Sequence, residues 1–187
     1  PKTISGTGQV TVRNARSVLR SESLQFSANG AARARPLRAE SGIHDSRIKV
    51  ASYNIHLGIG RDGQFNPERI ARVIAELDAD VICLQEVERN SAGVDMLAYL
   101  SAASGFHGIS GPTLSTPHGD YGNAILTRHP PGEVQRWDLS EPRREPRGAI
   151  AMLIHKGGCT MRMIATHLGL RPGERRCQIR KLMGFIH

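Results

Sequence analysis

Apolar and polar residues alternate over residues 48–54, and this period of two predicts a strand. After a glycine-rich loop, Asn66 and Pro67 predict a helix start, because asparagine caps a first turn and proline fits the first helical position. The apolar residues of that helix recur at intervals of three and four: Ile70, Val73, Ile74 and Leu77. The apolar run 81–84 then predicts a strand buried on both faces, so residues 48–84 are expected to form a β-α-β unit with parallel neighbouring strands.

The rest of the chain continues to alternate between strands and helices. The pattern predicts a helix at 96–103, a loop at 108–119, strands at 123–127, 149–154 and 160–166, and a helix from Pro172 onward. Gly157 and Gly158 suit a tight primed turn, so the last two strands should form an antiparallel hairpin. The final helix carries one apolar face, made of Ile179, Leu182, Met183 and Ile186.

Residues 1–47 differ in texture from residues 48–187. They carry eight Lys or Arg against three Asp or Glu, which is more than half of the net charge of +8. Residues 9–12 (Gln-Val-Thr-Val) fit a short strand but have no evident partner, and the frequent glycine and arginine predict a basic, mostly disordered arm. An added upstream segment fits these residues equally well. We therefore expect one catalytic domain, over residues 48–187.

The composition says more about the kind of partner that the protein binds than about the reaction that it catalyses. A basic balance suits an anionic partner, although an arginine-rich surface is equally common in proteins without one. The three cysteines have no zinc-binding spacing and are expected to be free thiols. No apolar run is long enough for a transmembrane helix or a signal peptide, so we expect a cytoplasmic protein; the oligomeric state is left open.

Three polar residues follow predicted strands, where active sites of layered α/β proteins collect. They are Asn54, Glu86 and His167. If the first two strands are parallel neighbours, Asn54 and Glu86 end side by side, and a carboxylate beside an amide oxygen suits Mg²⁺. Taken singly, each residue fits a turn, a solvated loop or a structural hydrogen bond equally well.

Four segments in order resemble the endonuclease/exonuclease/phosphatase superfamily. They are residues 53–56 (Tyr-Asn-Ile-His), 80–87 (Asp-Val-Ile-Cys-Leu-Gln-Glu-Val), 121–128 (Tyr-Gly-Asn-Ala-Ile-Leu-Thr-Arg) and 165–168 (Ala-Thr-His-Leu). The superfamily includes pancreatic-type deoxyribonucleases, abasic-site endonucleases, bacterial sphingomyelinases and inositol-polyphosphate 5-phosphatases. The resemblance implies an α/β (α+β) fold: a four-layer sandwich of two packed mixed sheets flanked by helices, of which this chain is the N-terminal two-thirds, incomplete at the C-terminus.

The resemblance also implies the roles of individual residues in the attack of water on phosphorus. Glu86 matches the glutamate that binds Mg²⁺, with Mn²⁺ as a substitute, and Asn54 matches the asparagine that supports the metal and the substrate phosphate. His167 matches a histidine that contacts the scissile phosphate, and Asn123 falls where related enzymes place a residue beside that histidine. Tyr121 is expected to donate a hydrogen bond to a phosphate oxygen.

Arg147 is a further expected phosphate contact, and it fits a solvated loop arginine equally well. Two departures from the family pattern limit the implied activity. The Gly-Asp-x-Asn and Ser-Asp-His segments that supply the water-activating groups do not occur in this chain, so we expect this polypeptide itself to be nearly inactive. Glu88 stands where deoxyribonuclease-like members carry an arginine, which disfavours a DNA backbone.

The expected function is therefore Mg²⁺-dependent hydrolysis of a phosphodiester or phosphomonoester, with a small or lipid phosphoester preferred. Two alternatives stay open. One is a DNA or RNA nuclease of the same superfamily, for which nucleic acid would be the partner. The other is a non-catalytic fragment or pseudo-enzyme.

Overall fold

The strand, helix and strand expected over residues 48–84 are present in the computed structural model, which describes residues 10–14, 47–91, 93–116 and 119–186. They are β2 (Ile48–Asn54), α2 (Pro67–Leu77) and the first part of β3 (Val81–Ser91). Strands β2 and β3 are parallel neighbours, as predicted. The side chain of Asn66 accepts a hydrogen bond from the backbone N–H of Arg69, which confirms the predicted helix cap.

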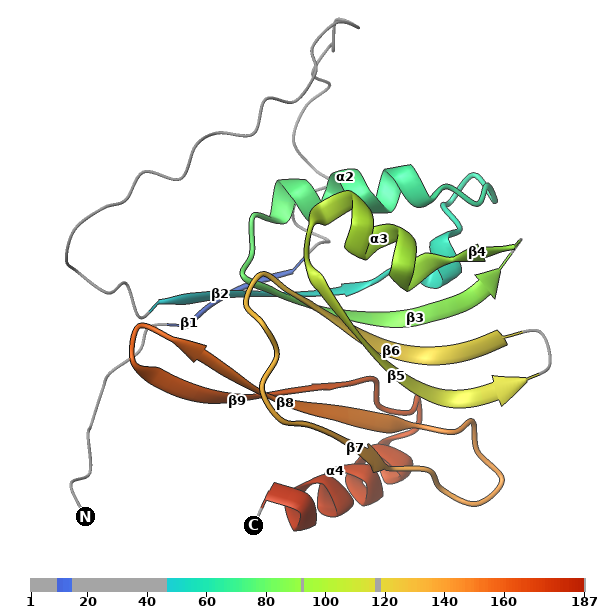
Figure 1. Ribbon diagram of the computed structural model, residues 1–187. Coiled ribbons are helices and arrows are strands. Elements are labelled where there is room, and N and C mark those ends of the chain that lie inside the picture. Colours follow the sequence, from blue (N-terminus) through green and yellow to red (C-terminus); the bar gives the residue numbers. More distant parts are fainter. Residues whose placement is uncertain (1–9, 15–46, 92, 117–118, 187) are drawn as a thin grey trace, which may run out of the picture.

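Four layers follow one another, with helices on the outside and two sheets between them (Figure 1). The first sheet is mixed and has the order β1 (Val10–Asn14), β2, β3, β6 (Gly119–Thr127), β5 (His107–Thr116), with β4 (Val94–Asp95) paired to β3. The second sheet is antiparallel in its three described strands: β7 (Val134–Asp138), β8 (Gly148–Lys156) and β9 (Cys159–Thr166). Helices α2 and α3 (Met96–Ser104) cover the first sheet, and α4 (Pro172–Ile186) covers the second (Figure 1). The expected four-layer sandwich is confirmed.

Three apolar layers hold these elements together. Along β3, Ile82 and Leu84 pack toward α2 and α3, while Val81 and Cys83 pack between the two sheets. The alternation explains the continuous apolar run, since both faces of this strand are buried. Each such side chain contributes about 1.5–3 kcal/mol by leaving water. The third layer lies between the second sheet and α4, where Trp137 stacks on Phe185 with ring centroids 5.2 Å apart.

Two sequence predictions need correction. Residues 108–119 were expected to be a loop, but residues 107–116 form β5, which pairs with β6 in antiparallel orientation as the last strand in the order of the first sheet. Glycine and proline are rare in strands, yet Gly111 is required here: a Cβ atom at this residue would lie 2.3 Å from Cγ1 of Ile150 in the second sheet. Close approach of the two sheets, which no local pattern reveals, explains the glycine.

The second correction concerns residues 10–14 of the expected arm. They form β1, which pairs in parallel with β2, so this short strand has a partner in the first sheet. The remainder of the arm, residues 1–9 and 15–46, lies outside the described residues. In the part of the chain that the structure describes, no helix is long and apolar enough to cross a membrane.

Candidate active site

Glu86 occupies an irregularity inside β3 rather than a loop after it. The pairing of β3 with β6 shifts between Leu84 and Val87, so two residues of β3 oppose Asn123 alone. At this bulge Glu86 has a left-handed backbone with φ of 56°, which costs an ordinary residue about 1–2 kcal/mol. Strict alternation from Leu84 would turn Glu86 toward the helix layer. The bulge gives that direction to Val87 and leaves Glu86 at the mouth of a cavity on the other face.

The end of β2 holds the Glu86 carboxylate from the neighbouring strand. Asn54 donates from Nδ2 to Oε1 of Glu86 at 2.7 Å, and Nδ1 of His56 lies 2.7 Å from Oε2. The backbone N–H of His56 donates to Oδ1 of Asn54 at 2.9 Å. Because a backbone N–H can only donate, this bond assigns the amide: its oxygen faces His56 and its nitrogen faces Glu86. The predicted contact of Asn54 with Glu86 is present.

The chemistry of this pair fits Mg²⁺. Burial by itself raises the pKa of the Glu86 carboxyl, but hydrogen bonds from Asn54 and His56, together with the nearby His56 and His167 rings, outweigh burial and leave that pKa below its ordinary value. The ionised carboxylate keeps free lone pairs beside each hydrogen bond. One carboxylate is enough for Mg²⁺, which fills its other positions with water and phosphate. In the orientation observed, Asn54 holds the carboxylate and Glu86 offers the charged oxygens. Among the described residues, no three His, Cys, Asp or Glu side chains gather as a metal-binding group.

The other predicted residues converge on Glu86 from different elements. Tyr121 and Asn123 lie on β6, Arg147 immediately precedes β8, and His167 immediately follows β9. Together they line one small cavity at the edge where the two sheets meet: Glu86, Thr113, Tyr121, Gly122, Asn123, Arg147 and His167. The structure thus brings together every residue that the sequence singled out, with Asn54 reaching the cavity through Glu86.

One backbone carbonyl ties the two sheets together beneath this cavity. The oxygen of Gly148 accepts from Nδ2 of Asn123 at 3.0 Å and from Oγ1 of Thr166 at 2.9 Å. Asn123 is buried, so this bond replaces the water that its amide would otherwise require. This shared acceptor links β6, which carries Tyr121, to the end of β9, which precedes His167. The two bonds therefore fix the position of Tyr121 relative to His167 across the sheets.

Arg147 is buried rather than solvated, with 6% of its surface exposed. Its two terminal nitrogens donate to the two carboxylate oxygens of Glu145, at 3.1 and 2.8 Å. The guanidinium therefore has a fork-on-fork partner in the loop between β7 and β8. Its Nε is also buried and has no hydrogen-bond partner among the described residues.

Burial shifts the pKa values of two further groups in the cavity in the direction that favours their neutral forms. It lowers the pKa of His167 below the ordinary histidine value; the charge of Arg147 adds to this shift, and Glu86 and Glu145 oppose it. Burial also raises the pKa of the Tyr121 hydroxyl, as do the charges of Glu86 and Glu145, whereas Arg147 lowers it. A neutral imidazole and a neutral phenol can each donate one hydrogen bond to a phosphate oxygen.

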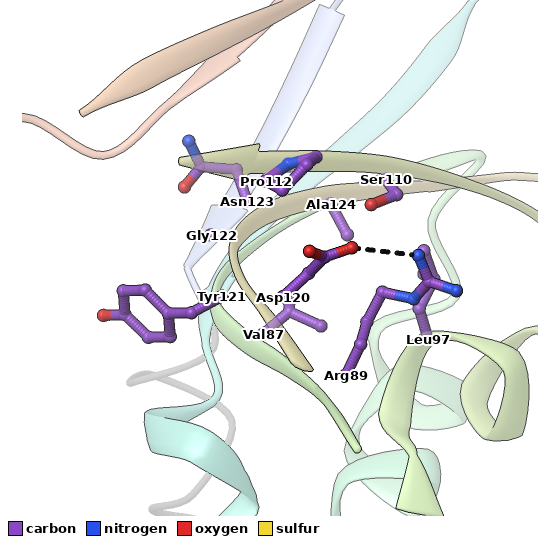
Figure 2. A pocket seen from close by; sticks show the side chains of 10 residues that line it. All are labelled: Val87, Arg89, Leu97, Ser110, Pro112, Asp120, Tyr121, Gly122, Asn123 and Ala124. Atoms are coloured by element: carbon purple, nitrogen blue, oxygen red, sulfur yellow. Dashed lines mark hydrogen bonds and ion pairs between the residues drawn. The ribbon is translucent and has the colours of Figure 1, made fainter. Parts of the chain in front are cut away.

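A second hollow lies on the opposite, helix-covered face of the same strands. Figure 2 shows Asp120 and Arg89 pointing into it, joined by an ion pair of 3.3 Å, while Tyr121 and Asn123 point away from it. Arg89 is also paired with Asp95 at 3.1 Å. Because these charges are paired with one another, we interpret this hollow as a gap in the packing between the first sheet and α3 and not as a binding site.

Sequence reasoning missed three residues of the site: His56, Thr113 and Glu145. His56 belongs to the segment 53–56 that carries the family resemblance. Its place two residues after Asn54 was the signal that could have identified it. Thr113 lay in the stretch that was predicted to be a loop. Glu145 follows no strand, and its place two residues before Arg147 was the available signal.

The chain is similar to known proteins over most of its length. The model of the Endonuclease/Exonuclease/phosphatase family matches residues 51–162. The uncharacterized protein YbhP of Escherichia coli (strain K12) is 26% identical over 153 residues, which are 75% of this chain and 60% of YbhP. The chain therefore spans less than two thirds of the length of this curated relative.

Solved structures agree with the fold. An endonuclease/exonuclease/phosphatase from Beutenbergia cavernae DSM 12333 superposes with a TM-score of 0.65 and 27% identity, over 74% of this chain and 44% of that one. ANGEL2, a 2′,3′-cyclic phosphatase solved with adenosine-2′,3′-vanadate, superposes with a TM-score of 0.58 and 23% identity, over 73% of this chain and 46% of that one. At that identity the second likeness concerns the fold alone.

Proposed function

Because the chain belongs to the endonuclease/exonuclease/phosphatase family, we propose that it carries the Mg²⁺-holding part of a phosphoester hydrolase active site. Mn²⁺ is the proposed substitute. The observation that supports this most directly is the convergence of Glu86, Tyr121, Asn123, Arg147 and His167 on one cavity from separate strands. The strained bulge that turns Glu86 into this cavity supports it further, since such strain persists mainly where function needs it.

Each residue has a proposed role in phosphate chemistry. Bound Mg²⁺ would polarise a phosphoryl oxygen and neutralise charge on the leaving oxygen. Glu86 would hold it, and Asn54 keeps the Glu86 carboxylate in place. His167, neutral near pH 7, would donate its ring N–H to a nonbridging oxygen as negative charge develops there. Tyr121 would donate its hydroxyl to another phosphate oxygen.

Arg147 would supply the fixed positive charge that draws the phosphate into the cavity, and Asn123 would keep Tyr121 and His167 in register. The group that activates water is not assigned to any residue described here. The proposed reaction therefore belongs to the whole protein, of which these residues form the phosphate-binding and metal-holding side.

The proposed substrate is a small or lipid phosphoester rather than nucleic acid. Glu88, two residues beyond Glu86, adds negative charge beside the site, where a nucleic-acid backbone would favour a basic residue. Aromatic residues make up only 4% of the chain, which leaves few platforms for stacking bases. The fold neighbour ANGEL2 is described as a 2′,3′-cyclic phosphatase, so a small cyclic ester is within the reach of this architecture.

The test is Mg²⁺ binding by the 187-residue chain and by Glu86→Gln, measured by titration calorimetry. The substitution keeps the shape of the side chain and an oxygen that can accept from Asn54, but it removes the charge. We expect Mg²⁺ affinity to fall at least tenfold, about 1.4 kcal/mol, because the only carboxylate of the proposed site is lost.

Glu76→Gln is the matched control. Glu76 is an exposed residue of α2, so this variant changes the net charge equally without touching the cavity. Equal Mg²⁺ affinity in the wild type and Glu86→Gln would rule out the metal assignment. Hydrolysis of bis-p-nitrophenyl phosphate by a protein of the relatives' full length, reduced by His167→Ala, would test the phosphate role separately.

A further inference from the structure

The pairing of Arg147 with Glu145 has a consequence for the charge of the substrate. The arginine that faces the cavity is buried, and both of its terminal nitrogens are already bonded to the carboxylate of Glu145. Glu145 itself is half exposed, with 50% of its side-chain surface accessible, in the loop between β7 and β8. The Arg147 charge that would attract phosphate is therefore paired with the negative charge of Glu145.

The remaining groups of the cavity do not restore that positive charge. Tyr121, Asn123 and Thr113 carry no positive charge, and burial lowers the pKa of His167, which favours its neutral ring. Glu86, which lines the same cavity, adds a second carboxylate. Among the residues described here, Arg147 is therefore the one fixed cation that lines the cavity, and it is matched by Glu145.

Any phosphate that reaches Arg147 must approach the Glu145 carboxylate. Repulsion between the two grows in proportion to the charge of the phosphate group. A phosphodiester carries one negative charge. A phosphomonoester carries two above its second pKa of about 6. The same carboxylate therefore penalises a monoester about twice as strongly, in free energy, as a diester.

We propose that Glu145 is a specificity-determining residue that makes this site prefer singly charged phosphodiesters to doubly charged phosphomonoesters. The inference rests on the proposed function and narrows its substrate class. The alternative is that Glu145 only supports Arg147. In that case the loss of Glu145 would leave the Arg147 guanidinium less well positioned and would weaken the binding of all anions equally.

The test compares two small probes with the same chain at pH 8 and constant Mg²⁺: dimethyl phosphate, a monoanion, and methyl phosphate, a dianion. Their dissociation constants are measured by NMR titration of the wild type, Glu145→Gln and Arg147→Gln. Glutamine keeps an oxygen that can accept from Arg147 but removes the charge. We expect Glu145→Gln to bind dimethyl phosphate about threefold more tightly and methyl phosphate about tenfold more tightly, a size appropriate to a half-exposed carboxylate.

The matched control is Glu76→Gln, which should leave both dissociation constants unchanged. Glu145→Ala repeats the measurement without any side-chain contact to Arg147, and the same dependence on ligand charge is expected. Equal changes for both probes, or weaker binding of both in Glu145→Gln, would overturn the proposal while Arg147→Gln still reports whether the cavity binds phosphate. If the wild type binds neither probe and Arg147→Gln changes nothing, the proposed function fails as well.

Discussion

The close approach of the two sheets at Gly111 leads to a quantitative prediction about packing beneath the site. An alanine Cβ at this residue would lie 2.3 Å from Cγ1 and 2.4 Å from Cδ1 of Ile150, where carbon atoms normally stay 3.5–4.0 Å apart. Ile150 is 1% exposed in the layer between the sheets, so it cannot withdraw into solvent. Gly111 does not need a left-handed backbone, so the clash alone sets the cost.

We expect Gly111→Ala to lower the free energy of unfolding by about 1–3 kcal/mol, the usual cost of overpacking a core. In a protein of this size that corresponds to a fall of roughly 2–4 °C in Tm for each kcal/mol. Gly184→Ala is the matched control. A Cβ at Gly184 meets open space inside α4, so alanine there should stabilise the chain by up to about 1 kcal/mol.

Ile150→Ala is the second substitution of a double-mutant cycle, because it removes both Ile150 atoms that the new methyl group of Gly111→Ala would meet. Alone it should cost about 2–5 kcal/mol through the cavity that it leaves. Combined with Gly111→Ala, the two costs should not add: we expect a favourable coupling of about 0.5–3 kcal/mol. Urea unfolding of the four proteins measures this cycle. Additive costs, or a Gly111→Ala variant as stable as the wild type, would refute the packing argument.

Two further outcomes follow from the site and from the sheet edge. Burial lowers the pKa of His167, so folding favours the neutral ring; its contribution to stability is complete above the ordinary histidine pKa of about 6.5 and is lost as the pH falls through the lower folded value. Urea unfolding at pH 5–8 should therefore show a steeper loss toward acid in the wild type than in His167→Gln, and parallel curves would contradict the shift. Deletion of residues 1–47 should leave a folded domain but expose the hydrogen-bonding edge of β2, which β1 covers. Light scattering should then detect association that the longer chain does not show, and an equally monomeric deletion variant would count against the pairing.

Local patterns were sufficient for the β-α-β unit and for the hairpin. The Asn66–Pro67 cap, the apolar face of α2 and the buried run at 81–84 each depend on neighbours within a few residues. Gly157 and Gly158 have φ of 57° and 76°, as the predicted primed turn requires. Asn54 and Glu86 could be placed together because parallel neighbouring strands end at the same edge of a sheet.

Motif resemblance identified the residues of the cavity but not how they act on one another. The sequence marked Glu86 as the residue after a strand, whereas β3 continues through it and a bulge against β6 decides which face it reaches. For Arg147 the sequence left a phosphate contact and a solvated loop arginine equally open, and the structure shows that this side chain is buried rather than solvated.

The remaining features depended on contacts between segments far apart in the chain. Residues 107–116 form a strand although their composition favours a loop, because pairing with β6 and the approach of Ile150 outweigh weak local preferences. Glu145 is only two residues from Arg147, but the fold decides that this ion pair lies against Glu86, Tyr121 and Asn123 of the first sheet. The type and spacing of residues determine the local preference of the backbone for helix, strand or turn, and they determine which chemical groups are present. The face that each group meets, and the charge beside it, are set by packing between sheets, which no short stretch of sequence contains.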